Sequence, residues 1–173
     1  MPHTALLIVV PEAEPLVSDW RLQYDRSAQR GVPAHITLLY PFVPTEKVDE
    51  KLLGELHRLF GAHTAFSFDL HRVARFPEVA WLAPDPVAPF KALIASIVAR
   101  FPDYPPYEGA HDDVIPHLTV AEGGIELQDR VEAAVSAHLP IRGHAGDVAF
   151  LFEDDEGLWH EAHRFPLSGR SAT

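Results

Sequence analysis

Two short motifs carry histidine and threonine side chains at a spacing that suits phosphoryl chemistry. His35 and Thr37 lie two residues apart in the first half of the chain, and His117 and Thr119 repeat this spacing about half the chain later. Each motif follows a proline, and aliphatic residues alternate with its polar ones. Because side chains on a β-strand alternate between its two faces, the histidine and threonine of each motif share one face. The aliphatic residues are then expected to anchor the other face in the core.

If the two strands lie side by side, two imidazoles and two hydroxyls converge on one cleft. One neutral histidine can accept a proton from a nucleophile while the other, protonated, donates a proton to the leaving group. Threonine hydroxyls can hydrogen-bond the non-bridging oxygens of a phosphate. The motifs therefore predict acid–base cleavage at one phosphorus atom, in which His35 and His117 move protons while Thr37 and Thr119 hold the phosphate.

The composition excludes other kinds of chemistry and of partner. The 173 residues include no cysteine, which rules out disulfides, zinc–thiolate sites, iron–sulfur clusters and thiol nucleophiles. The formal net charge of −11 argues against a long nucleic-acid duplex as the main partner. No apolar run approaches the ~20 residues that cross a bilayer. A cytoplasmic monomer is expected, with a single domain over residues 1–173 and no membrane partner.

Short strands alternate with helices along the chain. Apolar runs predict strands at 5–10, 36–40, 66–73, 79–83, 117–121, 148–152 and 158–165. The strands at 66–73 and 79–83 are predicted to form one hairpin, and those at 148–152 and 158–165 another. Helical spacing predicts helices at 13–29, after Thr45 as N-cap, from Asp85 and Pro86 to Phe101, and at 127–138. Because each motif strand precedes a loop and a helix, we predict an α+β fold with two pseudo-symmetric lobes. Each lobe is an antiparallel sheet with outer helices, and a cleft lies between them.

In these paired motifs the chain resembles the 2H phosphoesterase superfamily. Residues 35–42, His-Ile-Thr-Leu-Leu-Tyr-Pro-Phe, resemble its RNA 2′,5′-ligase or cyclic phosphodiesterase-like branch. The resemblance implies hydrolysis of a 2′,3′-cyclic phosphate or related cyclic phosphodiester without a metal or other cofactor. Some members also join or cut 2′-5′ RNA linkages. The resemblance further implies that His117 activates water and that His35 protonates the leaving ribose oxygen. The expected partner is a small nucleotide or cyclic phosphate, or an RNA end.

Three further residues are candidates for substrate contacts. Tyr40 and Phe42 follow the first motif and could stack on a base at the mouth of the cleft, or could equally pack the core or a turn. Arg75 could contact the phosphate or the base, or could lie at a solvated hairpin end. Arg72 and Arg164 are the other basic candidates for phosphate. Because the chain is acidic, a nucleotide-sized substrate fits better than a long RNA.

Two histidine-containing stretches raise the question of a metal site. His160 and His163 are three residues apart on a predicted strand and therefore face opposite sides, unlike the i, i+4 pair of zinc proteases. Residues 111–113, His-Asp-Asp, could bind a cation but are expected to be a solvated loop. No metal site is predicted from either stretch. Trp81 and Trp159 are expected to be core residues.

Three functions are therefore compared. The first, which we favour, is a metal-independent cyclic phosphodiesterase. The second is a module of the same fold that binds nucleotides or RNA ends, or a 2′-5′ RNA ligase. The third is a metal-dependent hydrolase that uses clustered histidines. Intact histidine and threonine in both motifs favour an enzyme over a binding module, and sensitivity to a chelator separates the third function from the first.

Overall fold

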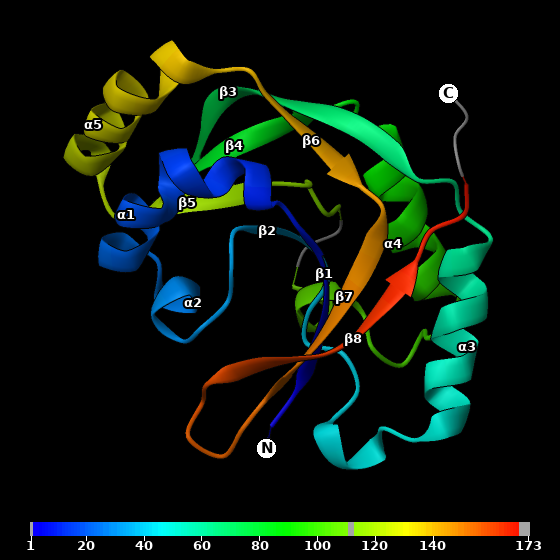
Figure 1. Cartoon of the computed structure of the whole chain (residues 1–173). Coiled ribbons are helices and arrows are strands. Elements are labelled where there is room, and N and C mark those ends of the chain that lie inside the picture. Colours follow the sequence, from blue (N-terminus) through cyan, green and yellow to red (C-terminus); the bar gives the residue numbers. More distant parts are fainter. Residues whose placement is uncertain (1, 111–112, 170–173) are drawn as a thin grey trace.

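Two four-stranded antiparallel sheets form the framework of the protein in the computed structural model, which describes residues 2–110 and 113–169 (Figure 1). The strand order is β2-β1-β7-β8 in the first sheet and β5-β4-β3-β6 in the second. The strands are β1 Thr4–Val9, β2 His35–Leu39, β3 Phe66–Phe76, β4 Val79–Asp85, β5 Leu118–Glu122, β6 Ile141–Ala145, β7 Asp147–Glu153 and β8 Trp159–Pro166. This arrangement confirms the predicted α+β fold with two antiparallel sheets.

The two motif strands are outer strands of different sheets. In the first sheet, β2 pairs with β1 and places Thr37 opposite Leu7, whereas in the second sheet β5 pairs with β4 and places Thr119 opposite Trp81. The strands β2 and β5 contact each other where the two sheets meet. The aliphatic residues that alternate with the motif side chains are at most 1 % exposed: Ile36, Leu38, Leu118 and Val120. Burial of one face therefore fixes the direction of the polar face.

Helices from both halves of the chain cover each sheet. The α-helices are α1 Glu14–Tyr24, α2 Arg26–Gln29, α3 Glu50–Gly61, α4 Ala88–Arg100 and α5 Ile125–Val135, and short 3₁₀ helices lie at Pro11–Ala13, Thr45–Lys47, Pro106–Gly109 and Ser136–His138. Helix α1 connects β1 to β2 but packs on β5, whereas α4 connects β4 to β5 but packs on β2 (Figure 1). Each lobe thus contributes a helix that packs on the motif strand of the other lobe. In the part of the chain that the structure describes, no helix is long and apolar enough to cross a membrane.

One continuous cluster of buried side chains joins the two lobes. It includes Leu6 of β1 and Leu82 of β4, both fully buried, and therefore reaches both sheets. The stripe predicted for the helix that ends near Phe101 is confirmed, because Phe90, Leu93, Ile94 and Ile97 of α4 are at most 7 % exposed. Burial of such side chains contributes about 1.5–3 kcal/mol each. The relative position of the two sheets is therefore set by the core.

The helix predicted for residues 13–29 is interrupted at Asp25. The backbone of Asp25 is extended (φ −126°, ψ 112°), and its side chain accepts a hydrogen bond from the backbone N–H of Ser27. Asp25 thus ends α1 and caps the short α2. Its carboxylate also forms an ion pair with Arg21 at 2.9 Å, with both side chains at most 5 % exposed. In the sequence, an arginine and an aspartate at i, i+4 are typical of an exposed helix face. The prediction therefore did not detect that Asp25 ends the helix.

Two predicted helix starts were wrong by a few residues. Thr45 lies in a short 3₁₀ turn, and the N-cap of α3 is Asp49, whose Oδ1 accepts from the backbone N–H of Leu52 at 2.8 Å. Asp85 continues β4 and pairs with Asp69 of β3, so α4 begins only at Ala88. The capping signal of Thr45 was overridden by the better cap Asp49, and that of Asp85 and Pro86 was overridden by strand pairing.

Strand β6 was not predicted, because Gly143 at its centre interrupts the apolar alternation. β6 pairs with β3, and Gly143 lies opposite Phe68. A Cβ atom at position 143 would lie 2.5 Å from Cζ of the Phe68 ring, so only glycine allows this close approach.

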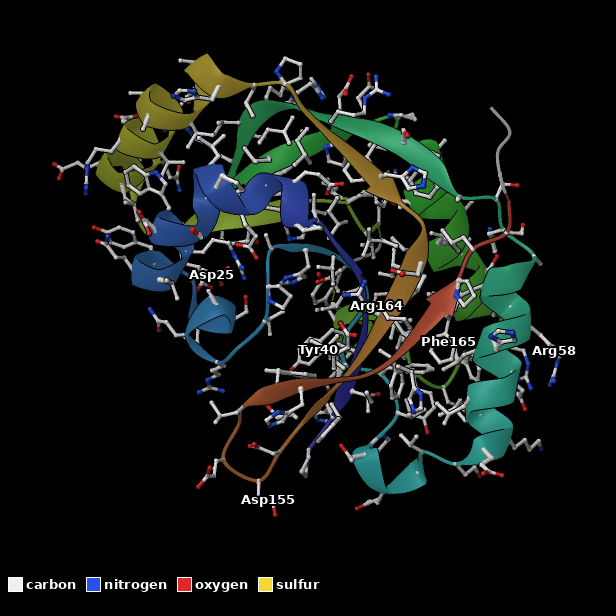
Figure 2. All side chains as sticks on the ribbon, viewed as in Figure 1. Asp25, Tyr40, Arg58, Asp155, Arg164 and Phe165 are labelled. Atoms are coloured by element: carbon white, nitrogen blue, oxygen red, sulfur yellow. The ribbon has the colours of Figure 1, made fainter. Side chains whose placement is uncertain are left out.

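The closing hairpin of β7 and β8 is confirmed. Its turn extends into solvent around Asp155 (Figure 2). Asp154 Oδ1 accepts from the backbone N–H groups of Glu156 and Leu158, and Gly157 has a φ of 83°, which glycine adopts without strain. The hairpin places Glu153 and Trp159, one at each side of the turn, beside the site described next.

Candidate active site

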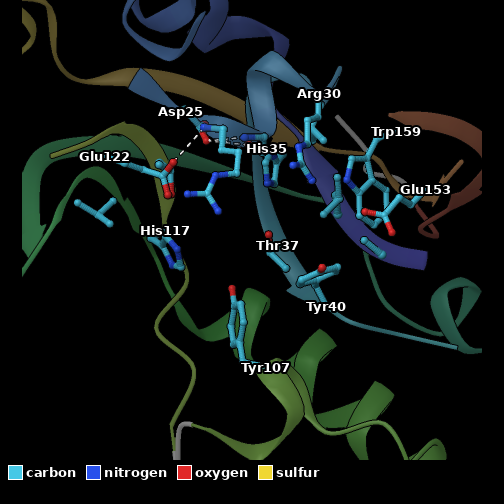
Figure 3. Close-up of a pocket in the computed structure, with 17 residues that line it drawn as sticks. Asp25, Arg30, His35, Thr37, Tyr40, Tyr107, His117, Glu122, Glu153 and Trp159 are labelled. Carbon is cyan, nitrogen blue, oxygen red and sulfur yellow. Dashed lines mark hydrogen bonds between the residues drawn. The ribbon is translucent and has the colours of Figure 1, made fainter. Parts of the chain in front are cut away.

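A cavity of about 410 Å³ lies between the motif strands, and all four motif side chains line it (Figure 3). His35 and Thr37 come from β2, whereas His117 immediately precedes β5 and Thr119 lies within it. The structure thus brings together the four residues that the sequence predicted to converge. They approach from the edges of two sheets rather than from neighbouring strands of one sheet.

Both histidines are held by the same backbone contact. Nδ1 of His35 lies 2.7 Å from the carbonyl oxygen of Pro33, and Nδ1 of His117 lies 2.7 Å from the carbonyl oxygen of Ile115. A carbonyl oxygen only accepts hydrogen bonds, so Nδ1 is the protonated nitrogen in each ring. Nε2 is then the nitrogen that can accept or donate a proton in the cavity. Spacing alone did not predict this pair of contacts.

The surroundings keep both imidazoles neutral near pH 7. Burial lowers the pKa of His35 to about 4; the Pro33 carbonyl opposes this effect, and the positive charge of Arg21 adds to it. The charge of His117 also lowers the pKa of His35, so the two rings interact electrostatically. Burial lowers the pKa of His117 as well, against the effect of the Ile115 carbonyl. Both imidazoles are thus in the form that can accept a proton, and one of them must be protonated before it can act as an acid.

Two arginines that the sequence did not single out line the cavity. Arg26 and Arg30 belong to α2 and its C-cap, and α2 exists because Asp25 ends α1. Within residues 2–110 and 113–169, neither guanidinium forms an ion pair. Both are therefore available to an anionic ligand. They follow no recognisable motif, and only the three-dimensional position of α2 identifies them.

One end of the cavity is aromatic. Tyr40 and Trp159 meet edge to face, with ring centroids 5.7 Å apart, and both line the cavity. Burial and the nearby carboxylates of Glu153 and Glu108 raise the pKa of the Tyr40 hydroxyl. The predicted cleft position of Tyr40 therefore agrees with the structure. Trp159, expected to be a core residue, is half-buried: it packs against the buried cluster that includes Leu7 and Leu151, and it also lines the cavity.

Two predicted substrate-contact residues lie elsewhere. Phe42 is 1 % exposed and packs edge to face against Phe101 and Phe150, so it belongs to the core. Arg75 is outside the cavity and forms ion pairs with Asp129 at 2.9 Å and Glu132 at 2.7 Å on α5. These two assignments are corrected, because hydrophobic packing holds Phe42 and two carboxylates hold Arg75.

The other basic candidates are also outside the cavity. Arg72 is exposed on β3, and Arg164 on β8 forms ion pairs with Asp147 and Glu161 (Figure 2). Trp81 is 6 % exposed, as expected for a core residue, and its ring packs against His117 at 5.8 Å between centroids.

Three more cavity residues escaped the sequence prediction. The backbone N–H of Tyr107 donates to the carbonyl of Tyr40 at 2.7 Å; burial raises the pKa of the Tyr107 hydroxyl, and a side-chain hydrogen bond with Thr37 opposes this. Glu122 accepts from the backbone N–H of Arg26 at 3.0 Å. Figure 3 shows Glu122 near His117 at one end of the cavity and Glu153 near the aromatic end. Tyr40 and Glu122 each follow their motif histidine by five residues, a correspondence that could have identified Glu122.

No group of three or more histidine or acidic residues able to hold a metal ion occurs among the residues that the structure describes. Nε2 of His160 lies 2.7 Å from Oδ2 of Asp154, whereas His163 stacks on Phe165 at 6.1 Å between centroids. The two histidines on β8 therefore have separate partners. The stretch considered as a cation site at 111–113 is described only at Asp113, since His111 and Asp112 lie outside the described residues.

Comparison with known proteins identifies the family. Residues 9–157 match the family model of the 2′-5′ RNA ligase superfamily. A protein of Shouchella clausii (strain KSM-K16), named "Putative phosphoesterase ABC1741", is 27 % identical over 153 residues, which cover 87 % of this chain and 88 % of that protein. The chain belongs to the 2′-5′ RNA ligase superfamily, and the predicted resemblance to 2H phosphoesterases is confirmed.

Solved structures share the same fold. The crystal structure of LigT from E. coli complexed with 3′-AMP has a TM-score of 0.64 and 15 % identity, over 98 % of this chain and all of that one. A LigT complex with ATP has a TM-score of 0.61 and 18 % identity, with the same coverage of both chains. The protein TT0787 of Thermus thermophilus has a TM-score of 0.65 and 18 % identity, again with the same coverage. The arrangement of two sheets around a central cavity is therefore LigT-like.

Proposed function

We propose that the protein hydrolyses a cyclic phosphodiester, such as a 2′,3′-cyclic nucleotide, by metal-independent acid–base catalysis with two histidines. The observation that carries this proposal is the convergence of both motifs on one cavity, in which each imidazole is fixed by the same hydrogen bond from Nδ1 to a carbonyl. Membership of the 2′-5′ RNA ligase superfamily and the name of the S. clausii relative support a phosphoesterase.

In the proposed reaction a water oxygen attacks phosphorus while its proton passes to Nε2 of His35. The bond between phosphorus and one ring oxygen breaks, and that oxygen takes a proton from protonated Nε2 of His117. The product is a phosphate monoester with a free neighbouring hydroxyl. Proton exchange with solvent then restores both histidines. Each proton transfer is expected to contribute about 10²–10⁴-fold to the rate.

The assignment of base and acid reverses the order that the family resemblance implies. His35 is the imidazole whose pKa falls to about 4, so it is neutral over the wider pH range, which suits a general base. The charge of Arg21 stabilises this neutral form. His117 is then the acid, and its pKa is below the usual 6.5 because its ring is buried. The reaction is therefore expected to favour mildly acidic conditions.

The remaining cavity residues suit a single phosphate group. Thr37 and Thr119 can donate hydroxyl hydrogen bonds to the two non-bridging oxygens, and Arg26 and Arg30 supply positive charge. Hydrogen bonds to an anion strengthen as negative charge builds up on those oxygens, which is how such groups lower the barrier. No step of this mechanism needs a metal ion.

The aromatic end of the cavity is best suited to a nucleoside as the organic group attached to the phosphate. The edge-to-face pair of Tyr40 and Trp159 offers an apolar wall, and base–aromatic stacking is worth about 1–3 kcal/mol per base. The fold neighbour LigT has been crystallised with 3′-AMP, ATP and NADP⁺, which also favours a nucleotide. The carboxylates of Glu122 and Glu153 and the net charge of −11 oppose a long polyanion. A nucleotide-sized substrate therefore fits better than a long RNA.

A 2′-5′ RNA ligase is the second candidate, which the family membership favours. In ligation a ribose hydroxyl would take the place of water as the nucleophile on the cyclic phosphate. Its proton would pass to His35, and the leaving ring oxygen would take a proton from His117, as in hydrolysis. The acidic surface makes hydrolysis of a small substrate the better-supported function.

The test is a screen of activity on the four 2′,3′-cyclic mononucleotides and ADP-ribose cyclic phosphate, with the position of the product phosphate determined. We expect turnover of at least one of these compounds, and loss of about 10²–10⁴-fold in the His117→Ala variant. His57 is exposed on α3, so His57→Ala is the matched control and should keep full activity. Absence of turnover on every compound by a folded protein would contradict the proposed hydrolysis.

A further inference from the structure

A second cavity of about 360 Å³ adjoins the candidate active site. His117 and Tyr107 line both cavities, so the two meet at these side chains. The volume lies in the range of about 300–1,000 Å³ that is usual for small-molecule sites. The mechanism proposed above leaves this space without a role.

The walls of the second cavity are mostly apolar. Phe76 stacks on Trp81 at 4.7 Å and directs its ring edge-on to His117 at 5.2 Å. Pro77, Val114 and Ile115 supply the other apolar surface, and Ile115 is 46 % exposed although it is a large aliphatic residue. Such surface is suited to an apolar or aromatic ligand group, because burial removes both surfaces from water.

Among the described residues that line this cavity, one carries a charged side chain besides His117. It is Asp113, whose carboxylate lies 3.4 Å from Nζ of Lys91. No arginine contributes to the described lining of this cavity, in contrast to the main cavity with Arg26 and Arg30. An anionic group would therefore face a carboxylate and an apolar wall without a cation of its own.

The position of His117 indicates which atom of the substrate would carry an apolar group that binds in the second cavity. In the proposed mechanism Nε2 of His117 gives its proton to an oxygen on phosphorus, so the substituent of that oxygen extends on the His117 side. A cyclic phosphate has one organic group, which the aromatic end of the main cavity can take. A linear phosphodiester has two, and the second would extend past His117.

Resting on the proposed function, we infer that the second cavity is a subsite for the second substituent of a linear phosphodiester, and that this substituent is uncharged and apolar or aromatic. The bound class is then a nucleoside phosphodiester of an apolar alcohol. A phosphate-bearing chain, as in RNA, is disfavoured at this subsite by Asp113 and by the lack of a cation among the described lining residues.

Binding can be measured by isothermal titration calorimetry, with each titrated sample checked for hydrolysis. The probes are the methyl and benzyl phosphodiesters of 2′-deoxyadenosine 3′-phosphate, which lack the ribose hydroxyl that could attack phosphorus and leave water as the only nucleophile. We expect the benzyl ester to bind at least about 10-fold more tightly than the methyl ester, because its phenyl ring buries apolar surface. A third probe, an ester whose alcohol carries a phosphate, should bind more weakly than the methyl ester.

A matched pair of variants localises the effect. Val114→Asn places an amide in the second cavity, whereas Val87→Asn makes the same change at the exposed N-cap of α4. The benzyl preference should fall below about 3-fold in Val114→Asn and remain at about 10-fold in Val87→Asn. The isosteric Val114→Thr replaces Val114→Asn if the latter loses its circular dichroism signal.

Three outcomes would each overturn the subsite. The unchanged protein could bind the two esters equally, the benzyl preference could survive both substitutions of Val114, or the phosphate-bearing ester could bind most tightly. Hydrolysis of 2′,3′-cyclic AMP by the same samples separates the two proposals. If hydrolysis proceeds without a benzyl preference, only the subsite is wrong. If the preference depends on Val114 but no cyclic phosphate is hydrolysed, the subsite is supported and the proposed hydrolysis is wrong.

Discussion

Acid should destabilise the native protein through His35. Burial lowers the pKa of this imidazole to about 4, whereas an unfolded chain gives it the ordinary value of 6.5. Between these values the unfolded state binds a proton that the native state does not, so the free energy of unfolding falls as the pH falls. The stabilisation is complete above pH 6.5 and is lost below about pH 4.

The size of this effect follows from the two pKa values. Multiplying their difference by about 1.4 kcal/mol per pH unit gives a total of roughly 3–4 kcal/mol, most of which is lost between pH 7.5 and pH 4.5. This is a large fraction of the free energy of unfolding of a typical domain, which is roughly 5–15 kcal/mol. His117 contributes in the same direction, because burial lowers its pKa too.

The assay is urea unfolding at a series of pH values between about 4.5 and 7.5, the range that spans most of this titration. Carboxylates also titrate in acid, so the quantity to compare is the pH dependence of the unchanged protein against that of His35→Gln, which cannot titrate at this position. The variant should lose roughly 2–3 kcal/mol less over this range. His57→Gln, at an exposed position on α3, should behave like the unchanged protein. Equal pH dependence in all three proteins, or an imidazole of His35 that titrates near its ordinary pKa of 6.5 by NMR, would refute the reasoning.

Three further predictions concern activity. The dependence of kcat/KM on pH should be bell-shaped, rising through the pKa of His35 near 4 and falling through that of His117, which lies below 6.5; a maximum above about pH 7 would contradict it. Activity should survive EDTA, and loss that a divalent ion restores would instead indicate a metal-dependent hydrolase. Trp159→Leu should raise KM for a cyclic nucleotide about 5- to 100-fold with little change in kcat, since stacking on a base is lost. Trp20→Leu, which changes a tryptophan of α1 outside the cavity, is its control, and an equal effect of both substitutions on KM would argue against stacking.

The sequence was sufficient for those parts of the fold and site that depend on local alternation. His35 and Thr37 share a face because the strand has a period of two, and the buried Ile36 fixes which face it is. The repeat of this pattern at His117 and Thr119 then predicted one cleft. The stripe of α4 and the two hairpins were equally readable, because each signal is contained within one or two neighbouring elements.

The rest depends on contacts between residues far apart in the sequence. Arg26 and Arg30 line the cavity only because the buried pair of Arg21 and Asp25 ends α1 and starts α2. Strand β6 depends on the fit of Gly143 over the Phe68 ring, which no local pattern records. Such packing is decided by tertiary structure rather than by propensity.

The same limit applies to single side chains. Phe42 follows a predicted strand and Trp159 lies near the start of another, and their sequence surroundings do not show which of them meets a ligand. The structure places Phe42 at 1 % exposure among other phenyl rings and Trp159 at the cavity. Which of two such residues meets a ligand is set by the neighbours that the fold brings to it.

The central claim, that His35 and His117 act on one phosphate, is tested most directly by kinetics of single and double variants on a hydrolysed cyclic phosphate. His35→Ala and His117→Ala should each lower kcat/KM about 10²–10⁴-fold with folding intact by circular dichroism, and His57→Ala should change it little. The double variant should lose far less than the product of the two single losses, because the residues act as a unit. Full activity of a folded His117→Ala protein on every cyclic phosphate tested, or losses that multiply in the double variant, would contradict a shared active site.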